Sequence, residues 1–454
     1  MSLTLLAWLG LYVLFAFLAW QRPVWGVCLY FLSYFGDPMS WWWGIPAQGY
    51  SWNLVAAIIA MLSGIMHAGV PVLEEAGSDH KQRALHMVAL LIALNATVVH
   101  FGFSASLDIS ERNYVLLLKF VLLYYLMVLC VRDRSDLKIV LMTLVLATGH
   151  LGYEVTFNNR GGGGRLEGIG PPTANESNAL ASMLVTILPL EGVLFLLAKG
   201  WRKAVVFVAV GLTVNVLLKC NSRGAFLGAG VSGIVLLVSA PSQVRMTILK
   251  LLLLGGVGTF SLMRDPQIVD RFSTTFESAE NRDGSAAHRI DFWKAGIRMI
   301  ADYPMGQGGD GFKKVHAKTY IDVSLLAVDT GNRAVHNGFI NEACEWGVQG
   351  LLLKLALLLG ACFLAYQAQR VSARSLDTEG ALIGAALIGG FGGLACTSMF
   401  CDVLDNEWGI WLAALSGTFY RLYGSAFPVP SRFDDNESVV MSRSRGVSPV
   451  GSFL

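Results

Sequence analysis

Charged residues are scarce in this chain of 454 residues: Asp, Glu, Lys and Arg together make up 15%, whereas a soluble domain carries about 25%. The formal net charge is only +2, and no run of basic residues alternates with aromatics, which argues against a nucleic-acid partner. The seven cysteines are scattered, mostly within apolar segments, so neither a disulfide framework nor a metal cluster is indicated. Residues 1–20 lack the charged start and the cleavage site of a signal peptide, so we expect this first block to remain as a helix.

The chain is instead rich in apolar blocks, such as LTLLAWLGLYVLFAFLAW at 3–20. Blocks of about 18–20 residues have the length that crosses a bilayer as a helix. We therefore predict an all-α polytopic membrane protein with about 12–14 transmembrane helices, the count depending on whether residues 36–51 are re-entrant or interfacial. The predicted helices are 3–20, 24–36, 52–72, 86–104, 114–131, 137–153, 178–198, 202–218, 224–240, 247–263, 346–367, 380–400 and 407–422.

Loops with and without cations alternate along the chain. The positive-inside rule makes the cation-rich set cytoplasmic: it holds Lys81, Arg83, Arg132, Arg134, Lys138, Lys199, Arg202, Lys203, Arg245, Lys250, Arg370, Arg374 and Arg421. The loop 36–51 has no Lys or Arg and falls on the opposite, outer side, where Trp41–Trp43 are expected to form an aromatic anchor. This count places the N-terminus outside.

Four parts follow from this pattern. Residues 1–263 are predicted to form an N-terminal helix bundle, and 346–424 the C-terminal membrane helices. Between them, 264–345 forms a large outer loop with its own amphipathic helix over 286–304, whose apolar face we expect to hold Ile290, Trp293, Ile297 and Ile300. Residues 425–454 are polar and rich in helix breakers, which is typical of a disordered cytoplasmic tail.

The outer side carries a few cations that break the charge rule. They occur in four places: Arg160 and Arg165 in a glycine-rich loop, Lys219 and Arg223 at a helix junction, Arg289 on the loop helix, and Arg333 near His336. Each has a plainer reading, because a lone interfacial arginine usually reaches toward lipid headgroups, a glycine-rich loop is often a connector, and Arg289 fits the solvated side of its helix. A polar stripe of Asn337, Asn341 and Glu345 is harder to dismiss on a helix that enters the membrane.

Together the four places predict one outer cavity with guanidinium groups around an imidazole. Guanidinium binds phosphate oxygens bidentately, and imidazole can take a proton from a hydroxyl near neutral pH. This combination favours a phosphorylated lipid as a glycosyl donor, with the phosphate as the leaving group.

The motifs SRGAFLGAG at 222–230, HRIDFWKAG with YPMGQGGDGF at 288–312, and HNGFINEACEWGVQGLLL at 336–353 resemble the O-antigen ligase and polymerase superfamily, and GPPTANESNALASMLVTILPL at 170–190 is similar to O-glycosylation ligases associated with exosortase systems. The resemblance implies a glycosyltransferase of the C type in the bacterial inner membrane, inverting and metal-independent, with no cofactor. It implies transfer of a glycan from undecaprenyl diphosphate to an acceptor hydroxyl at the periplasmic face.

Residue by residue, the resemblance implies that Arg223 and Arg289 hold the diphosphate and that His336 acts as the general base. We expect Asn337, Asn341 and Glu345 to orient the His336 ring. Substrate roles for Arg160, Arg165, Lys219 and Arg333 rest on charge alone.

Several alternatives stay open at this point. The acceptor is lipid A core, another glycan chain or a protein hydroxyl, so ligase, polymerase and protein O-oligosaccharyltransferase are all compatible with the motifs. A lipid-linked glycan transporter is less favoured, because we find no matched pair of interrupted helices. Asp402, Asp405 and Glu407 would suit a divalent cation, although helix capping is the preferred interpretation. A glycan-binding protein without activity is a further alternative.

Overall fold

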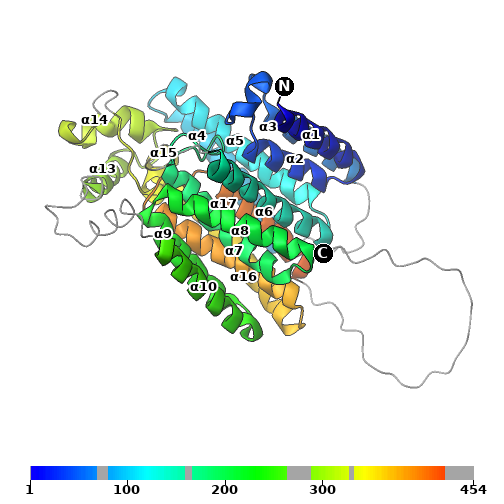
Figure 1. The fold of residues 1–454 in the computed structure, drawn as a ribbon. Coiled ribbons are helices and arrows are strands. Elements are labelled where there is room, and N and C mark those ends of the chain that lie inside the picture. The colour runs from blue at the N-terminus through cyan, green and yellow to red at the C-terminus, as the bar shows by residue number, and fades with distance from the viewer. Residues whose placement is uncertain (1, 69–79, 159–165, 263–287, 327–331, 425–454) are drawn as a thin grey trace, which may run out of the picture.

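The computed structural model describes residues 2–68, 80–158, 166–262, 288–326 and 332–424, and every regular element in them is helical (Figure 1). The helices are α1 (Leu3–Gln21), α2 (Val24–Phe35), η1 (Trp42–Ala47), α3 (Trp52–His67), α4 (His80–Gly102), α5 (Leu107–Cys130), α6 (Arg134–Phe157), α7 (Ser177–Leu197), α8 (Trp201–Cys220), α9 (Arg223–Ser239), α10 (Ser242–Leu262), α13 (Arg289–Asp302), η2 (Gly311–His316), α14 (Ala317–Tyr320), η3 (Val323–Leu325), α15 (Gly338–Arg374), α16 (Thr378–Ser398) and α17 (Glu407–Tyr423). The predicted tail 425–454 lies outside the described residues, as do Arg160 and Arg165.

The prediction of an all-α polytopic membrane protein is confirmed. Within the described residues, each of the thirteen predicted segments coincides with a helix, and 8 of the helices there are long and apolar enough to cross a membrane. Three more, α2, α3 and α9, are apolar but shorter. Two helices begin well before the prediction: α15 begins at Gly338, eight residues before 346, and α5 at Leu107, seven residues before 114. Ser106 caps α5 by accepting a hydrogen bond from the Ile109 N–H.

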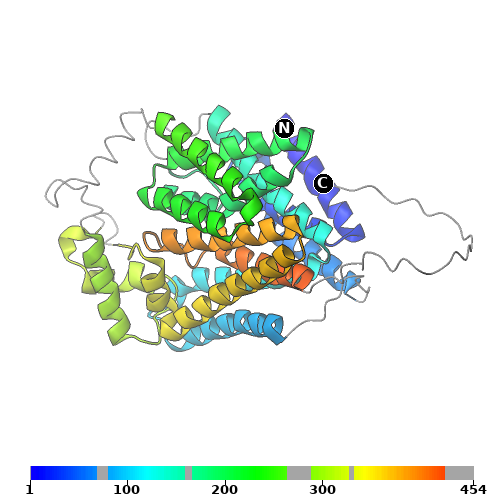
Figure 2. The same ribbon diagram turned by 90° about the horizontal axis from the view of Figure 1, so that it is seen from below.

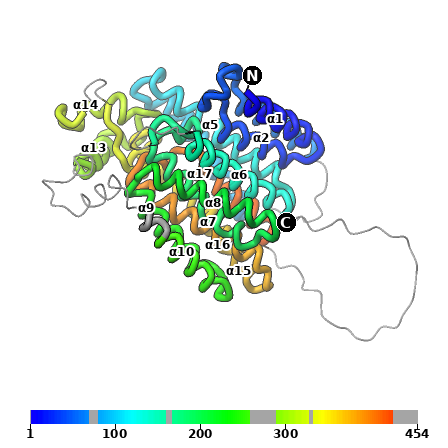
Figure 3. The backbone as a smooth tube through the Cα atoms, viewed as in Figure 1, coloured from blue at the N-terminus to red at the C-terminus, as the bar shows by residue number. Residues whose placement is uncertain are grey.

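The centre of the bundle is α16, which packs against α7, α9, α15 and α17 (Figures 1 and 2). Small residues allow the close approach of α9 and α16, since a Cβ at Gly228 would lie 2.5 Å from Thr397 Cγ2. Gly230, two residues further along α9 and so on the other side of the helix, faces open space and makes no such contact. The helices α1, α2 and α3 gather at one flank of this bundle (Figure 3).

Of the three tryptophans predicted to form an aromatic anchor, only one has an exposed ring. Trp42 is 45% exposed, but Trp41 and Trp43 are each 2% exposed. The Trp41 indole donates to the Phe35 carbonyl at 3.2 Å, and the Trp43 ring lies 6.3 Å from that of Trp8. Only one ring of the predicted anchor is therefore exposed, because the short helix over 42–47 turns the other two rings inward.

The cation-rich loops meet at one end of the bundle. Arg134 pairs with Asp377 at 3.1 Å, Lys138 pairs with Glu379 at 3.1 Å, and Arg421 donates to the Val131 carbonyl. The loop helices α13 and α14 lie together at the opposite end, where α15 begins (Figure 2). The grouping agrees with the alternation seen in the sequence; which end faces the cytoplasm stays a prediction.

The loop helix α13 forms where expected but buries a different face. Ile290 and Ile297 are 58% and 57% exposed, whereas Phe292 and Met299 are buried against the start of α15. The other two expected residues, Trp293 and Ile300, are partly buried and pack against the same cluster, so the expected apolar face was right for two of its four residues and the buried face is shifted by part of a turn. The reason is that α13 packs on α15 through Gly296, where a Cβ would lie 2.5 Å from Ile340 Cγ2.

A break in α15 ties the loop to the membrane helices. Gly347 has φ 82° and ψ 169°, a conformation open in practice to glycine alone. The carbonyls freed on its N-terminal side are satisfied from other elements: Gln307 N–H donates to Cys344 O at 3.0 Å, Gly308 N–H to Glu345 O at 2.8 Å, and Asn95 Nδ2 to Trp346 O at 2.9 Å. The glycine-rich segment 304–311 is thus a strap that holds the loop onto α15.

Candidate functional site

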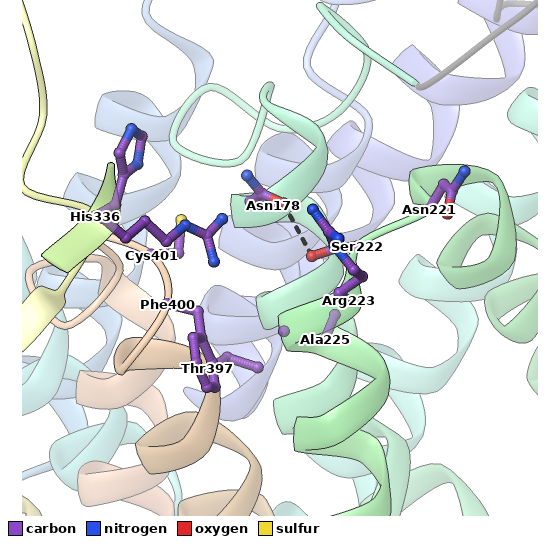
Figure 4. A pocket seen from close by; sticks show the side chains of 11 residues that line it. Asn178, Asn221, Ser222, Arg223, Ala225, His336, Thr397, Phe400 and Cys401 are labelled. Atoms are coloured by element: carbon purple, nitrogen blue, oxygen red, sulfur yellow. Dashed lines mark hydrogen bonds between the residues drawn. The ribbon is translucent and has the colours of Figure 1, made fainter. Parts of the chain in front are cut away.

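One cavity of about 170 Å³ brings Arg223, Arg289 and His336 together, although they come from three distant parts of the chain (Figure 4). The predicted gathering of guanidinium groups around an imidazole is therefore present in the structure. The residues that line it are Asn178, Asn221, Ser222, Arg223, Gly224, Ala225, Arg289, His336, Thr397, Phe400 and Cys401.

Arg223 is positioned by the tight junction between α8 and α9. Asn221 adopts a left-handed conformation with φ 46°, which ends α8 and lets α9 start at Arg223. Ser222 precedes α9, and its hydroxyl donates to Asn178 Oδ1 on α7 at 2.9 Å. A Cβ at Gly224 would lie 3.0 Å from Phe400 Cβ, so the junction is held between α7 and the end of α16.

Arg289 is the first residue of α13 and lies on the same side of the helix as Phe292, whose ring is buried. The guanidinium of Arg333 packs on that ring, 4.9 Å from the ring centroid. Arg333 also donates its backbone N–H to the Lys313 carbonyl at 3.3 Å. The packing of α13 on α15 therefore brings further positive charge to the cavity edge.

His336 is held in a backbone conformation that a non-glycine residue rarely adopts. Its φ is 58°, in the left-handed region. The Asp402 carboxylate accepts the His336 N–H at 3.2 Å and the Asn337 N–H at 2.8 Å, and the Trp293 indole donates to the His336 carbonyl at 3.4 Å. These three bonds hold the backbone at His336 in this conformation, whose local strain is common at functional sites.

The environment of the imidazole favours its neutral form. Burial lowers the pKa of His336 to about 4, and the charges of Arg289, Arg333 and Lys313 lower it in the same direction. At neutral pH the ring is therefore uncharged and able to accept a proton. Lys313, on η2, was not among the residues suggested by the sequence.

The polar stripe after His336 does structural work on α15. Asn337 is the N-cap, and its side-chain oxygen accepts the N–H groups of Phe339 and Ile340 at 3.1 and 3.2 Å. Asn341 and Glu345 are both buried, at 5% and 2% exposure. None of the three lines the cavity.

Buried charge lies beside this stripe. Glu342 and Lys354, at 1% and 2% side-chain exposure, form an ion pair at 3.4 Å across the break at Gly347. The pair was not anticipated, since Lys354 stands in the run LLLKLALLL, which reads as an ordinary membrane segment.

The remaining charge-based suggestions do not converge on the cavity. Lys219 is exposed near the end of α8 and does not line it. Arg333 does not line it either, although its charge acts on His336. Asp402, which the sequence analysis considered only for metal binding or helix capping, is the residue that holds the His336 backbone.

Asp402, Asp405 and Glu407 do not converge on a common point. Asp402 accepts backbone N–H groups, whereas Glu407 accepts hydrogen bonds from the hydroxyls of Tyr30 at 2.6 Å and Thr173 at 3.0 Å. Within the described part of the chain, no group of three or more His, Cys, Asp and Glu is arranged to hold a metal ion. Burial raises the pKa of Asp402 to about 6.

Comparison with known proteins assigns the region around the cavity to a family. Residues 204–355 match the family model described as O-antigen ligase. This stretch includes Arg223, Arg289 and His336, so the chain is a polytopic membrane protein that carries an O-antigen ligase family domain, a domain of the ligase or glycosyltransferase type. No curated protein matches the chain.

Proposed function

We propose that this protein is a glycosyltransferase that moves a glycan from undecaprenyl diphosphate to an acceptor hydroxyl, at the membrane face where α15 begins. The observation that carries the proposal is the cavity itself, in which Arg223 and Arg289 lie beside a neutral His336. The family match over 204–355 supports lipid-linked glycans as substrates.

The reaction requires the protein to stabilise the leaving diphosphate and to accept the proton of the attacking hydroxyl. The acceptor oxygen attacks the anomeric carbon of the donor while the bond from that carbon to the diphosphate oxygen breaks, which inverts the configuration. Arg223 and Arg289 bind the diphosphate and stabilise the charge that develops on it as it leaves. His336 takes the proton of the attacking hydroxyl.

A base with a pKa of about 4 is weak at neutral pH. Binding of the donor would raise this pKa. The diphosphate brings negative charge beside His336, where it offsets Arg289 and the other two cations. An opposite charge nearby favours the protonated imidazole, so the pKa of His336 rises when the donor is bound. The ring is thus a better base in the complex than in the empty site.

The acceptor distinguishes the members of this class. Transfer to lipid A core would make the protein an O-antigen ligase, transfer to a second lipid-linked glycan a polymerase, and transfer to a serine or threonine a protein O-oligosaccharyltransferase. The cavity serves each of these reactions, because it holds the donor phosphates and the base and leaves the acceptor unspecified.

The test uses purified protein in detergent with an undecaprenyl-diphosphate-linked glycan and EDTA. Lipid A core, a second glycan-lipid and a serine-rich peptide are offered separately. We expect Arg223→Lys and Arg289→Lys to weaken donor binding, because lysine keeps the charge but loses the bidentate geometry. His336→Ala is expected to lower turnover by about 10²–10⁴-fold, the usual contribution of a positioned base.

Lys219→Ala is the matched control, since it removes an exposed cation outside the cavity. It should leave transfer unchanged. Normal turnover of the three cavity variants at equal membrane abundance would refute the mechanism, and transfer that requires a divalent cation would refute its metal-independent form.

A further inference from the structure

A second hollow lies on the other side of the bundle, between α2, α3, α5 and the start of α17. It consists of two cavities of about 550 and 410 Å³ that share Leu116, Lys119, Pro172 and Thr173, so they adjoin along α5, and we refer to them together as the cleft. On α5 its lining extends from Asp108 to Leu126, which at a rise of about 1.5 Å per residue gives a length of about 27 Å. No residue of this cleft lines the cavity around His336.

The lining changes from polar to apolar along α5. Its outer end carries Asp108, Glu111 and Arg112, all exposed, and its inner end carries Leu122 and Leu126. Half of a bilayer, with its headgroup layer, is about 20–22 Å thick. At about 27 Å the cleft is somewhat longer than one leaflet, so it can span the leaflet with its charges at headgroup level and its leucines beside the acyl chains.

Lys119 lies where the two parts of the cleft meet. It is exposed and forms no hydrogen bond or ion pair with any residue that the structure describes. A lysine in a membrane helix is costly unless an anionic partner is present. Further out lie two carboxylates, Asp108 and Glu111, and one guanidinium, Arg112, so the outer end is anionic on balance. The cleft thus offers a cation to a phosphate and two anions to an amine placed beyond it.

We propose that this cleft binds one phospholipid with a primary-amine headgroup. Its phosphate is bound by Lys119, its ammonium group by Asp108 and Glu111, and an acyl chain lies along the α5 leucines. The mixed signs of the lining favour a zwitterionic headgroup over a purely anionic one. This binding is independent of the proposed glycosyl transfer, because none of its residues belongs to the donor cavity.

The bound lipid would also support the helix that follows the Asp402 loop. Glu407 begins α17 and lines the cleft, where Tyr30 and Thr173 bind its carboxylate. Lipid packed against this wall restrains α17 and the loop 399–406 that precedes it. We therefore expect the lipid to raise the thermal stability of the protein, as any ligand specific to the folded state does.

The experiment is native mass spectrometry of the delipidated full chain, titrated with phosphatidylethanolamine, phosphatidylcholine and phosphatidylglycerol, alongside thermal unfolding. Lys119→Glu reverses the charge, and Leu122→Trp fills the apolar part at a position that is 45% exposed and so tolerates the larger ring. Leu146→Trp on α6 is the control, being 48% exposed and outside the cleft.

We expect one tightly retained phosphatidylethanolamine, with retention reduced at least about tenfold in both cleft variants and unchanged in Leu146→Trp, a tenfold change being about 1.4 kcal/mol. Equal retention of phosphatidylcholine, or no effect of either variant, would mean ordinary annular lipid and would overturn the proposal. Preferential binding of an acceptor glycolipid such as lipid A core would also overturn it and would assign the cleft to the acceptor. Glycosyl transfer measured on the same variants reports separately on the donor cavity.

Discussion

Removal of the Asp402 carboxylate should release His336 from its left-handed conformation. In the structure this carboxylate accepts two backbone N–H groups, from His336 and Asn337, and so holds the residue at φ 58°. Asp402→Ala removes both acceptors without touching Arg223 or Arg289. The variant therefore separates placement of the base from binding of the donor.

The magnitude follows from the energies of these contacts. A hydrogen bond to a charged group contributes about 1.5–3 kcal/mol, and the left-handed conformation costs a non-glycine residue about 1–2 kcal/mol. Without these two acceptors, only the bond from the Trp293 indole to the His336 carbonyl still opposes this cost. His336 then leaves its productive conformation by a factor of up to about 5–30. We expect kcat to fall by a factor in this range, while donor affinity stays within about threefold.

The assay is steady-state transfer together with direct binding of the donor. Asp402→Asn, which retains one side-chain oxygen acceptor, should lose less activity than Asp402→Ala. Asp322→Ala is a matched control, because that carboxylate also accepts a backbone N–H, from Ser324 at 2.9 Å, but lies outside the cavity. A kcat for Asp402→Ala within twofold of the original protein would refute the reasoning, as would an equal loss of donor binding.

Lys313→Met should move the acidic limb of kcat/KM upward from about pH 4, because it removes one of the cations that disfavour protonation of His336. In the unmodified protein, the acidic limb of kcat reports the pKa of His336 in the donor complex, so it should lie at a higher pH than the acidic limb of kcat/KM. Gly347→Ala should lower stability by about 1–3 kcal/mol and expose the strap 304–311 to protease, since its backbone conformation suits glycine alone. Lys354→Met should destabilise the protein by about 3–5 kcal/mol, seen in thermal unfolding, because it leaves Glu342 buried without its cation.

Controls exist in the chain for each of these changes. Lys318→Met removes an exposed lysine on α14, and Gly211→Ala adds a Cβ where nothing lies within 4 Å. A pH profile unchanged by Lys313→Met would argue against its charge acting on the base. A second change, Glu342→Leu, should recover most of the loss in Lys354→Met; failure to do so would place the defect in packing instead of the ion pair.

Part of the site was predictable because its cationic residues occur in outer loops, where few cations are expected. Arg223, Arg289 and His336 each stand where an outer loop should lack cations, within motifs that resemble one family. Asp402 was not identified as the residue that holds His336, because the two are 66 residues apart and nothing in the local sequence of either indicates the other. Lys313 reads as an ordinary solvated lysine, and Lys119 lies inside an apolar segment, so loop charges did not reveal it.

The sequence by itself determined that this is a helical membrane protein, since apolar blocks of membrane length and alternating loop charges are local properties. The predicted membrane span began at 346, next to Gly347, but the break in α15 at that glycine was not predicted. Which face of α13 is buried, and that Asp402 meets His336, were decided only by tertiary structure. These depend on how α13, α15 and α16 pack, and packing between distant segments leaves no periodic signal in any one of them.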